Sequence, residues 1–190
     1  MIIGLTGKNA AGKGETANYL KTKGFTCYSL SDVIRQEATK KSMEHSRDNM
    51  INLGNELRKL YGPGFLARKI NERIKPGKTI SGNDSFVIDS IRSPFEVNEL
   101  NKNRGFFLIG IEAPIETRFK RIQKRSRIGE AKTLKELMAQ EERENLKNEA
   151  NQQLDATYEM ADFFIKNDGT FKALHNKIEL ILQKIQVKGA

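Results

Sequence analysis

The chain has 190 residues, of which 37% are hydrophobic and 30% are charged. This length suits one α/β domain, and no apolar stretch approaches the roughly 20 residues that a membrane-spanning helix requires, so we expect no membrane partner. The formal net charge of +9 indicates an anionic partner. Because the excess cations cluster beside loop motifs and no series of aromatic residues accompanies them, we favour a small phosphorylated molecule over nucleic acid.

Cysteine usage and the first residues predict a cytoplasmic protein. Cys27 is the only cysteine and lies in an apolar stretch, which predicts a buried strand residue with no disulfide or zinc role. Residues 1–6 lack the charged region and the cleavage site of a signal peptide. We therefore expect residues 2–6 to form a core strand in a reducing compartment.

The segment after this strand has the spacing of a phosphate-binding loop. Residues 7–14 have the sequence GKNAAGKG, which is G-x-x-x-x-G-K, and residues 13–22 are predicted to form the helix that must follow. The backbone N–H groups of such a loop surround an anion at the helix start, and Lys13 would reach the outer phosphates. Gly14 stands where most of these loops carry the Ser or Thr that binds magnesium. The predicted nucleotide-binding residues here are Gly7, Asn9, Ala10, Ala11, Gly12, Lys13, Gly14, Glu15 and Thr16.

The rest of the chain alternates predicted strands and helices, which is typical of a parallel sheet covered on both faces. A helix is expected to begin at Val33, capped by Asp32 or by Ser31. Further strands are predicted at residues 25–30, 86–89, 105–112 and 161–165. Further helices are predicted at residues 46–61, 65–74, 93–96 onward, 114–126, 133 toward 148, and after the turn at 167–169. The strand at 105–112 is the most apolar and is expected to be central.

Candidate binding residues follow the predicted strands, and open α/β sheets bind ligands at the carboxyl ends of their strands. Arg35 lies one turn into its helix, where its guanidinium could bind a substrate phosphate. Asp32 could accept a proton from an attacking hydroxyl or merely cap the helix. Asp89 ends a buried strand, the usual position of a carboxylate that binds Mg²⁺ directly or through water; a simple turn carboxylate is the alternative. Arg92 would point into the same cleft.

A basic helix and a late turn supply the remaining candidates. The helix carries Arg118, Arg121 and Arg125, and Arg127 follows it. These residues form either a solvated basic surface or a lid, at about residues 118–148, which neutralises the transferring phosphoryl group and excludes water. We favour the lid and assign catalytic roles to Arg121 and Arg125, together with Lys13 and Asp89. The turn with Asn167 and Gly169 is predicted either to surround a purine ring or to be an ordinary turn.

These motifs resemble those of the P-loop nucleoside monophosphate kinases, and the resemblance is strongest to the archaeal adenylate-kinase-related, or dephospho-CoA-kinase-like, proteins. Residues 12–14 are similar to the adenylate kinase loop, which also has Gly after its Lys. The similarity to that family continues at residues 28–35, 86–92, 118–127, 132–133 and 161–169. One departure is Glu15, which stands where adenylate kinases have Thr. A carboxylate near phosphates is unfavourable unless it points away or pairs with a lid arginine.

The resemblance implies a single P-loop kinase domain over residues 1–190, with acceptor-binding helices at about residues 32–75. Its fold would be a three-layer α/β fold with a five-stranded parallel sheet, helices on both faces and a small helical lid. ATP with Mg²⁺ would phosphorylate a nucleoside or deoxynucleoside monophosphate, held by Arg35, Arg92 and, less strongly, Arg58. Alternatives are dephospho-CoA as a hydroxyl acceptor, with Asp32 as the base, and a nucleotide-binding switch or RNA-associated NTPase. The oligomeric state stays open.

Overall fold

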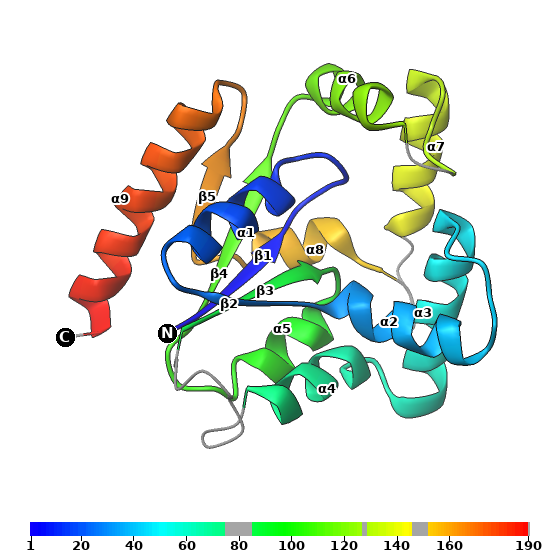
Figure 1. Ribbon diagram of the computed structural model, residues 1–190, viewed down its shortest axis with the longest axis horizontal. Coiled ribbons are helices and arrows are strands. Elements are labelled where there is room, and N and C mark those ends of the chain that lie inside the picture. The colour runs from blue at the N-terminus through cyan, green and yellow to red at the C-terminus, as the bar shows by residue number, and fades with distance from the viewer. Residues whose placement is uncertain (75–84, 127–128, 146–151, 190) are drawn as a thin grey trace.

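The computed structural model describes residues 1–74, 85–126, 129–145 and 152–189. Its centre is one parallel sheet in the order β2-β3-β1-β4-β5 (Figure 1). The strands are β1 (Ile2–Thr6), β2 (Thr26–Ser29), β3 (Phe86–Ile91), β4 (Phe106–Glu112) and β5 (Phe163–Lys166). The predicted α/β fold with a five-stranded parallel sheet is therefore confirmed. The predicted central position of the most apolar strand is wrong, because β1 occupies the centre and β4 lies beside it.

Alternate strand residues bury opposite faces of the sheet, as the period of two in a strand requires. Ile2, Phe86 and Leu108 belong to one core, whereas Ile3 and Val87 belong to the other. The first core is covered by α2 (Leu30–Lys40), α3 (Arg47–Tyr61), α4 (Phe65–Arg73) and α5 (Pro94–Leu100). The second is covered by α1 (Lys13–Thr22) and α9 (Phe171–Gly189). These layers confirm the prediction of helices on both faces.

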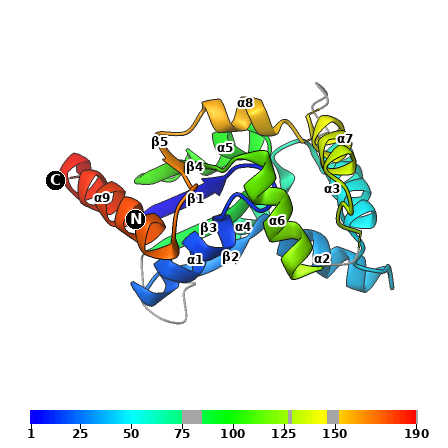
Figure 2. The same cartoon turned by 90° about the horizontal axis from the view of Figure 1, so that it is seen from above.

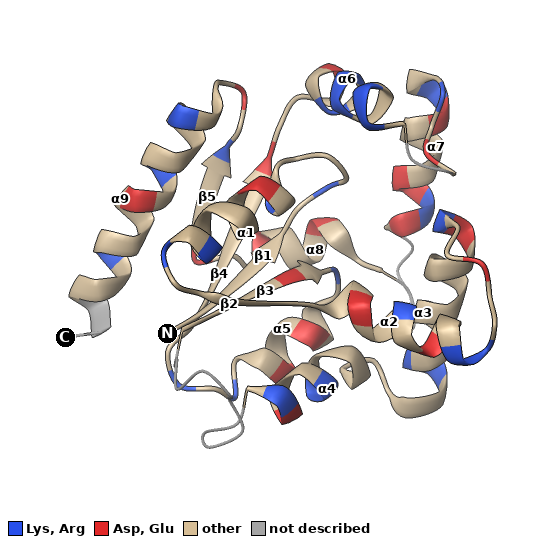
Figure 3. Cartoon of the chain, in the orientation of Figure 1, with Lys and Arg blue, Asp and Glu red and all other residues tan. Residues whose placement is uncertain are grey.

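Two further helices stand apart from the sheet. Figure 1 shows α6 (Ile115–Arg125) and α7 (Leu134–Glu144) beyond the sheet, and both views place α7 beside α3 (Figure 2). They share a small apolar cluster of Ile122, Ala131 and Leu137, which also contacts Ala10 of the phosphate loop. The range predicted for a lid, about residues 118–148, thus includes most of α6 and all of α7, and the lid itself stays a prediction. Most charged residues of α6 are basic, whereas α7 carries both basic and acidic residues (Figure 3).

The helix starts show where local sequence signals were sufficient. Thr133 caps α7 and accepts from the Glu136 N–H, and Ser93 caps α5, at the two positions where the sequence predicts these helices to begin. The predicted start of α2 is wrong. Ser29 caps this helix through a bond from the Ser31 N–H, so α2 begins at Leu30 and Asp32 lies inside its first turn. Consequently, β2 ends one residue earlier than predicted. Cys27 lies in this strand as predicted, but it is only partly buried.

The region after α7 differs from the expectation. That helix ends at Glu144, and the predicted continuation through residues 146–148 lies outside the described residues. An additional short helix, α8 (Leu154–Glu159), packs against β1 and β4. No helix in the described part of the chain is long and apolar enough to cross a membrane.

Candidate functional site

Two glycines allow the loop between β1 and α1 to curl. Gly7 has φ +136°, and a Cβ at this position would lie 2.0 Å from the carbonyl oxygen of Ile111. Gly12 has φ +123°, and a Cβ there would lie 2.2 Å from Nδ2 of Asn167. Both positions therefore require glycine for conformation and for space. The path of the loop depends on the ends of β4 and β5, which supply the two neighbours.

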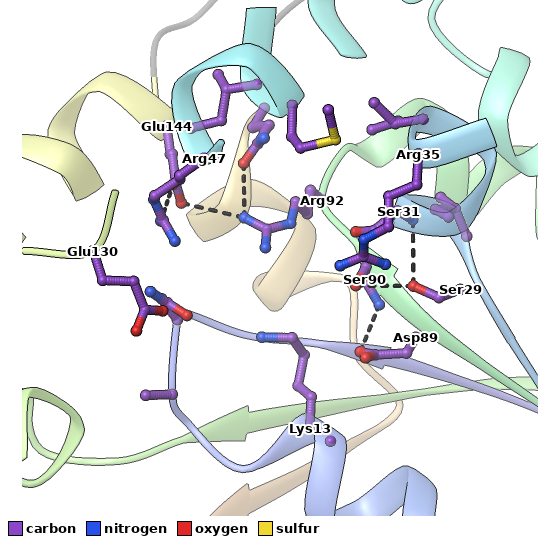
Figure 4. Close-up of a pocket in the computed structure, with 18 of the residues that line it drawn as sticks. Lys13, Ser29, Ser31, Arg35, Arg47, Asp89, Ser90, Arg92, Glu130 and Glu144 are labelled. Carbon is purple, nitrogen blue, oxygen red and sulfur yellow. Dashed lines mark hydrogen bonds and ion pairs between the residues drawn. The ribbon is translucent and has the colours of Figure 1, made fainter. Parts of the chain in front are cut away.

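Lys13 lies inside this loop. Its Nζ donates to the carbonyl oxygens of Gly7 at 2.6 Å and Lys8 at 3.0 Å. Burial lowers the pKa of Lys13 to about 8, and the negative charge of Asp89 partly opposes this effect. Figure 4 shows the side chain extending from α1 into the cleft. A bound phosphate would supply the counter-charge that the buried ammonium group lacks.

Nucleotide affinity should fall as the pH rises above about 8. Below that pH Lys13 is already charged, whereas above it binding of ATP must take up a proton. At pH 9 we expect the dissociation constant for ATP to be about tenfold larger than at pH 7. The terminal phosphate, with a second pKa of about 6, does not titrate in this range. Calorimetry in buffers of different ionisation enthalpy measures both quantities; constant affinity without proton uptake would contradict the assignment.

The loop opens into a cleft of about 1120 Å³. The cleft is bounded by the phosphate loop, the starts of α2 and α3, the end of β3, α6 and the turn after β5. Among the described residues that line it, seven are Lys or Arg and four are Asp or Glu. This excess of positive charge favours an anionic ligand. The lining includes these predicted residues: Asn9, Ala10, Gly12, Lys13, Gly14, Glu15, Arg35, Arg58, Asp89, Arg92, Arg121, Arg125 and Asn167.

Two predicted acceptor arginines face the cleft from the side opposite Lys13. Figure 4 shows Arg35 from α2 and Arg92 from the end of β3, both on the far side of the space into which Lys13 extends. Arg35 is half-exposed and donates to Asp32 at 2.6 Å. Between them Ser90 has φ +67°, a left-handed conformation that costs energy in a non-glycine residue and marks functional sites.

The predicted magnesium carboxylate also lies in the cleft. Oδ1 of Asp89 accepts from the Ser90 N–H at 2.6 Å. Thr16, the first hydroxyl after the loop, is fully buried and donates to the Gly12 carbonyl. The described residues contain no group of three or more His, Cys, Asp or Glu that could hold a metal. One carboxylate fits Mg²⁺ that keeps most of its waters and binds phosphate oxygens, which is the usual coordination of this ion.

The predicted lid arginines are held by specific partners. Arg121 donates to the carbonyl oxygens of Ala10 and Ala11 at 3.2 Å and to that of Asn167 at 3.1 Å. Burial lowers its pKa from the ordinary value, but a guanidinium stays charged at neutral pH. Arg125 donates to Oδ1 of Asn9 at 2.7 Å and pairs with Glu130, which also lines the cleft.

Other predicted residues lie outside the cleft lining. Arg118 is buried, pairs with Glu141 of α7 and donates to the Asn9 carbonyl at 3.4 Å, so it joins α6, α7 and the phosphate loop. Arg127 lies outside the described residues. The cleft lining also excludes Gly7, Ala11, Thr16, Asp32 and Gly169.

Glu15, the departure from the adenylate kinase pattern, has a partner. Its Oε1 lies 2.9 Å from Nε2 of His175 on α9, and the His175 ring stacks on Tyr19 at 4.0 Å between centroids. These contacts join α1 to α9. A carboxylate beside the phosphate loop is thus held by a side chain 160 residues away, which no local sequence signal indicates.

Several residues that line the cleft were not predicted from the sequence. Arg47, the first residue of α3, and Glu144, the last of α7, are joined by an ion pair, and both line the cleft. Arg47 directly follows the helix cap Ser46, and this is the only local signal near it. The remaining unpredicted lining residues are Ser29, Leu30, Ser31, Ile34, His45, Met50, Ile51, Leu66, Ser90, Ser126, Glu130, Gln152 and Phe171.

Comparison with known proteins agrees with the geometry of the loop and sheet. A family model described as an AAA domain matches residues 3–152. The UPF0200 protein of Pyrococcus abyssi is 32% identical over 192 residues, covering 97% of both chains. The UPF0200 protein of Pyrococcus horikoshii is 30% identical over 188 residues, again covering 97% of both.

Solved structures with the same fold include small-molecule kinases. TT1252 from Thermus thermophilus has a TM-score of 0.64 at 19% identity, covering 97% of both chains. Shikimate kinase from Aquifex aeolicus has a TM-score of 0.55 at 15% identity, covering 98% of this chain and 99% of that one. A gluconokinase from Sinorhizobium meliloti has a TM-score of 0.56 at 10% identity, covering 99% and 97%. At these identities the likeness establishes the fold alone.

Proposed function

We propose that this chain, which belongs to the UPF0200 family and carries an AAA domain, transfers the γ-phosphoryl group of ATP to a nucleoside or deoxynucleoside monophosphate. One observation carries the proposal. The cleft has the buried Lys13 of a phosphate loop on one side and two arginines, Arg35 and Arg92, on the other. Two phosphorylated molecules can therefore meet in one space. The kinase fold of its structural neighbours supports phosphoryl transfer by analogy.

Catalysis in such a cleft depends on position and charge. Lys13 and the loop N–H groups would bind the donor phosphates, and Arg35 and Arg92 would orient the acceptor phosphate. An acceptor oxygen forms a bond to the γ-phosphorus while the bond from that phosphorus to the β–γ bridging oxygen breaks, and its electron pair leaves with ADP. A monophosphate dianion carries no proton on the attacking oxygen, so no general base is needed. When bound, Mg²⁺ would neutralise donor charge, held by Asp89 through water.

The α6 side of the cleft would supply further positive charge. Arg121 and Arg125 both line the cleft beside the phosphate loop. Charge on the transferring phosphoryl group spreads over its oxygens, and fixed guanidinium groups nearby stabilise it. Because α6 and α7 cover this end, they would also restrict water as a competing acceptor.

A hydroxyl acceptor such as dephospho-CoA gains less support. Asp32, the candidate base for that reaction, lies outside the cleft lining and pairs with Arg35. Replacement by asparagine would test it directly, because near-normal turnover of Asp32→Asn excludes a mechanism that needs this base. An RNA-associated NTPase would instead show slow hydrolysis that RNA stimulates and monophosphates do not affect.

A coupled assay of ADP release tests the proposal. The panel contains ribonucleoside and deoxyribonucleoside monophosphates, dephospho-CoA, shikimate, gluconate and single-stranded RNA, each added to ATP and Mg²⁺. At least one monophosphate should raise ADP release at least tenfold above background hydrolysis and appear as a diphosphate product. If no monophosphate does so, the proposed function is wrong.

Arg35→Ala should weaken acceptor binding without destabilising the protein. We expect the KM for the acceptor to rise about tenfold or more, because a charge-assisted hydrogen bond to phosphate contributes about 1.5–3 kcal/mol. The exposed pair with Asp32 contributes little to stability, so the melting temperature should hold. Lys40→Ala is the matched control, since Lys40 lies on the same helix, pairs with Glu37 at the same spacing and does not line the cleft. Equal KM values for both variants would refute the role of Arg35.

A further inference from the structure

A carboxylate from α7 lies between two arginines of the cleft. Oε1 of Glu144 pairs with Nη2 of Arg47, and Oε2 lies 3.3 Å from Nη1 of Arg92 (Figure 4). The same Nη1 donates to Oε1 of Gln152 at 2.9 Å. Three separate segments, α3, the end of β3 and α7, thus meet at one carboxylate. No sequence motif assigns Arg47 or Glu144 to any role.

This cluster differs from the chain's structural ion pairs. Arg58 with Glu96 and Arg118 with Glu141 each match one cation to one anion, and both arginines are at most 5% exposed. In the Glu144 cluster, counted over the described residues, two cations share one anion. Their side chains remain 13% exposed at Arg47 and 19% at Arg92, and both line the cleft. The cluster therefore keeps one surplus positive charge facing a space that a ligand can enter.

Some guanidinium N–H groups of the cluster have no hydrogen-bond acceptor among the described residues. Nε of Arg47 is buried and has no hydrogen-bond partner among the described residues. An unpaired buried donor is costly, and guanidinium forks match the oxygens of a phosphate group. Only one end of each fork contacts Glu144, so further N–H groups are available for a tetrahedral anion. The surplus charge and the unpaired donor both indicate an anionic ligand.

We propose that Arg47, together with Arg92, binds the phosphate group of the acceptor, and that Glu144 is a positioning residue that holds both guanidinium groups. This inference rests on the proposed function and makes it more specific, because it requires a phosphorylated acceptor. Gly129, which lies between α6 and α7, packs closely against Arg47, because a Cβ on Gly129 would lie 3.3 Å from the Cβ of Arg47. The α6–α7 unit would therefore complete the acceptor site as well as cover the donor.

Calorimetry with inorganic phosphate tests the role of Arg47. The protein is first saturated with a non-hydrolysable ATP analogue and Mg²⁺, so that the β- and γ-phosphate positions of the loop are occupied and added phosphate reports on the acceptor side. We expect Arg47→Ala to weaken phosphate binding at least tenfold and Arg47→Lys, which keeps the charge but loses the fork, about fivefold. The affinity for the ATP analogue should change less than twofold in both. Arg104→Ala, an exposed arginine outside the cleft lining, should match the wild type.

Glu144→Asp tests positioning with the charge conserved. The shorter side chain cannot reach both guanidinium groups, so we expect phosphate to bind about fivefold more weakly and the acceptor KM to rise with little change in kcat. Glu142→Asp is the control, because Glu142 lies two residues before Glu144 on the same helix and is exposed. If Glu144→Asp lowers only the melting temperature and leaves phosphate affinity unchanged, the carboxylate merely joins helices and the positioning role is wrong.

The outcomes separate this inference from the proposed function. If the wild type phosphorylates a monophosphate and Arg47→Ala and Arg47→Lys have the wild-type acceptor KM, this inference alone fails. If the wild type phosphorylates no monophosphate at all, the proposed function fails first. Turnover of shikimate or gluconate without turnover of any monophosphate would overturn the phosphate assignment, because the anionic group recognised would then be a carboxylate.

Discussion

Replacing Lys13 by methionine should lower phosphoryl transfer about a hundredfold to a thousandfold while the protein stays folded. The methionine side chain fills similar space but cannot donate to phosphate, and one fixed donor to developing charge contributes about this much. The effect should appear both in the dissociation constant for ATP and in ADP release with the best acceptor. The matched control is Lys21→Met, since Lys21 is exposed on the same helix.

The effect on stability should have the opposite sign to the effect on activity. The pKa of Lys13 is about 8 in the folded protein and near 10.5 when exposed, so its charged form destabilises the fold below pH 8. That cost, on the order of 3 kcal/mol at pH 7, disappears as the pH rises from 8 to 10.5. Lys13→Met removes it, although it also loses the bonds to two loop carbonyls. The melting temperature at pH 7 should therefore not fall, and a large fall would indicate a structural lysine.

The parts of the fold that could be predicted from the sequence are those with a local or repeated signal. The loop spacing, the strand before it and the helix after it are contiguous, and the structure has β1 and α1 at the predicted bounds. The helix caps at Ser93 and Thr133 could also be predicted, because each side chain bonds to a backbone group within three residues. The alternation of strands and helices is a repeated pattern along the chain, and it predicted the parallel sheet.

The start of a helix could not be predicted where three nearby residues are equally suitable as its cap. Ser29, Ser31 and Asp32 are all good caps, and the local sequence does not show which backbone adopts the extended conformation. Pairing with β3 extends the chain as far as Ser29, and this selects the cap. The short helix α8 lacks a side-chain cap and was missed. Strand order is likewise not local, so the apolarity of β4 indicated burial and not a central position.

In the site too, positions that follow from the sheet could be predicted, whereas contacts between distant segments could not. Residues near the carboxyl end of β3, such as Asp89 and Arg92, could be predicted because parallel strands bring their carboxyl ends together. The side-chain partners of charged residues could not be predicted, since Glu15 contacts His175 and Arg47 contacts Glu144 only because their helices pack together. A basic residue alone does not show whether it binds a ligand or another side chain. Arg58 is the clearest example.

Arg58→Met should lower the free energy of unfolding by about 3–5 kcal/mol, because it leaves the buried carboxylate of Glu96 without its counter-ion. Nε and Nη2 of Arg58 both donate to Oε1 of Glu96, at 3.1 and 2.8 Å, and both side chains are almost fully buried. Oε2 of Glu96 accepts from the Arg92 N–H at 2.8 Å, so the pair also fixes the end of β3. Urea denaturation measures the change.

A second substitution separates stability from acceptor binding at Arg58. In Arg58→Met with Glu96→Gln no charge remains buried, and the glutamine can still accept from the Arg92 N–H, so much of the lost stability should return. Lys69→Met, which breaks an exposed pair with Glu72, should cost less than about 1 kcal/mol. If Arg58→Met is as stable as the wild type but has a higher acceptor KM, the guanidinium serves the acceptor, as the sequence predicted. A loss of stability that the second substitution repairs would show that the same arginine builds the wall of the cleft.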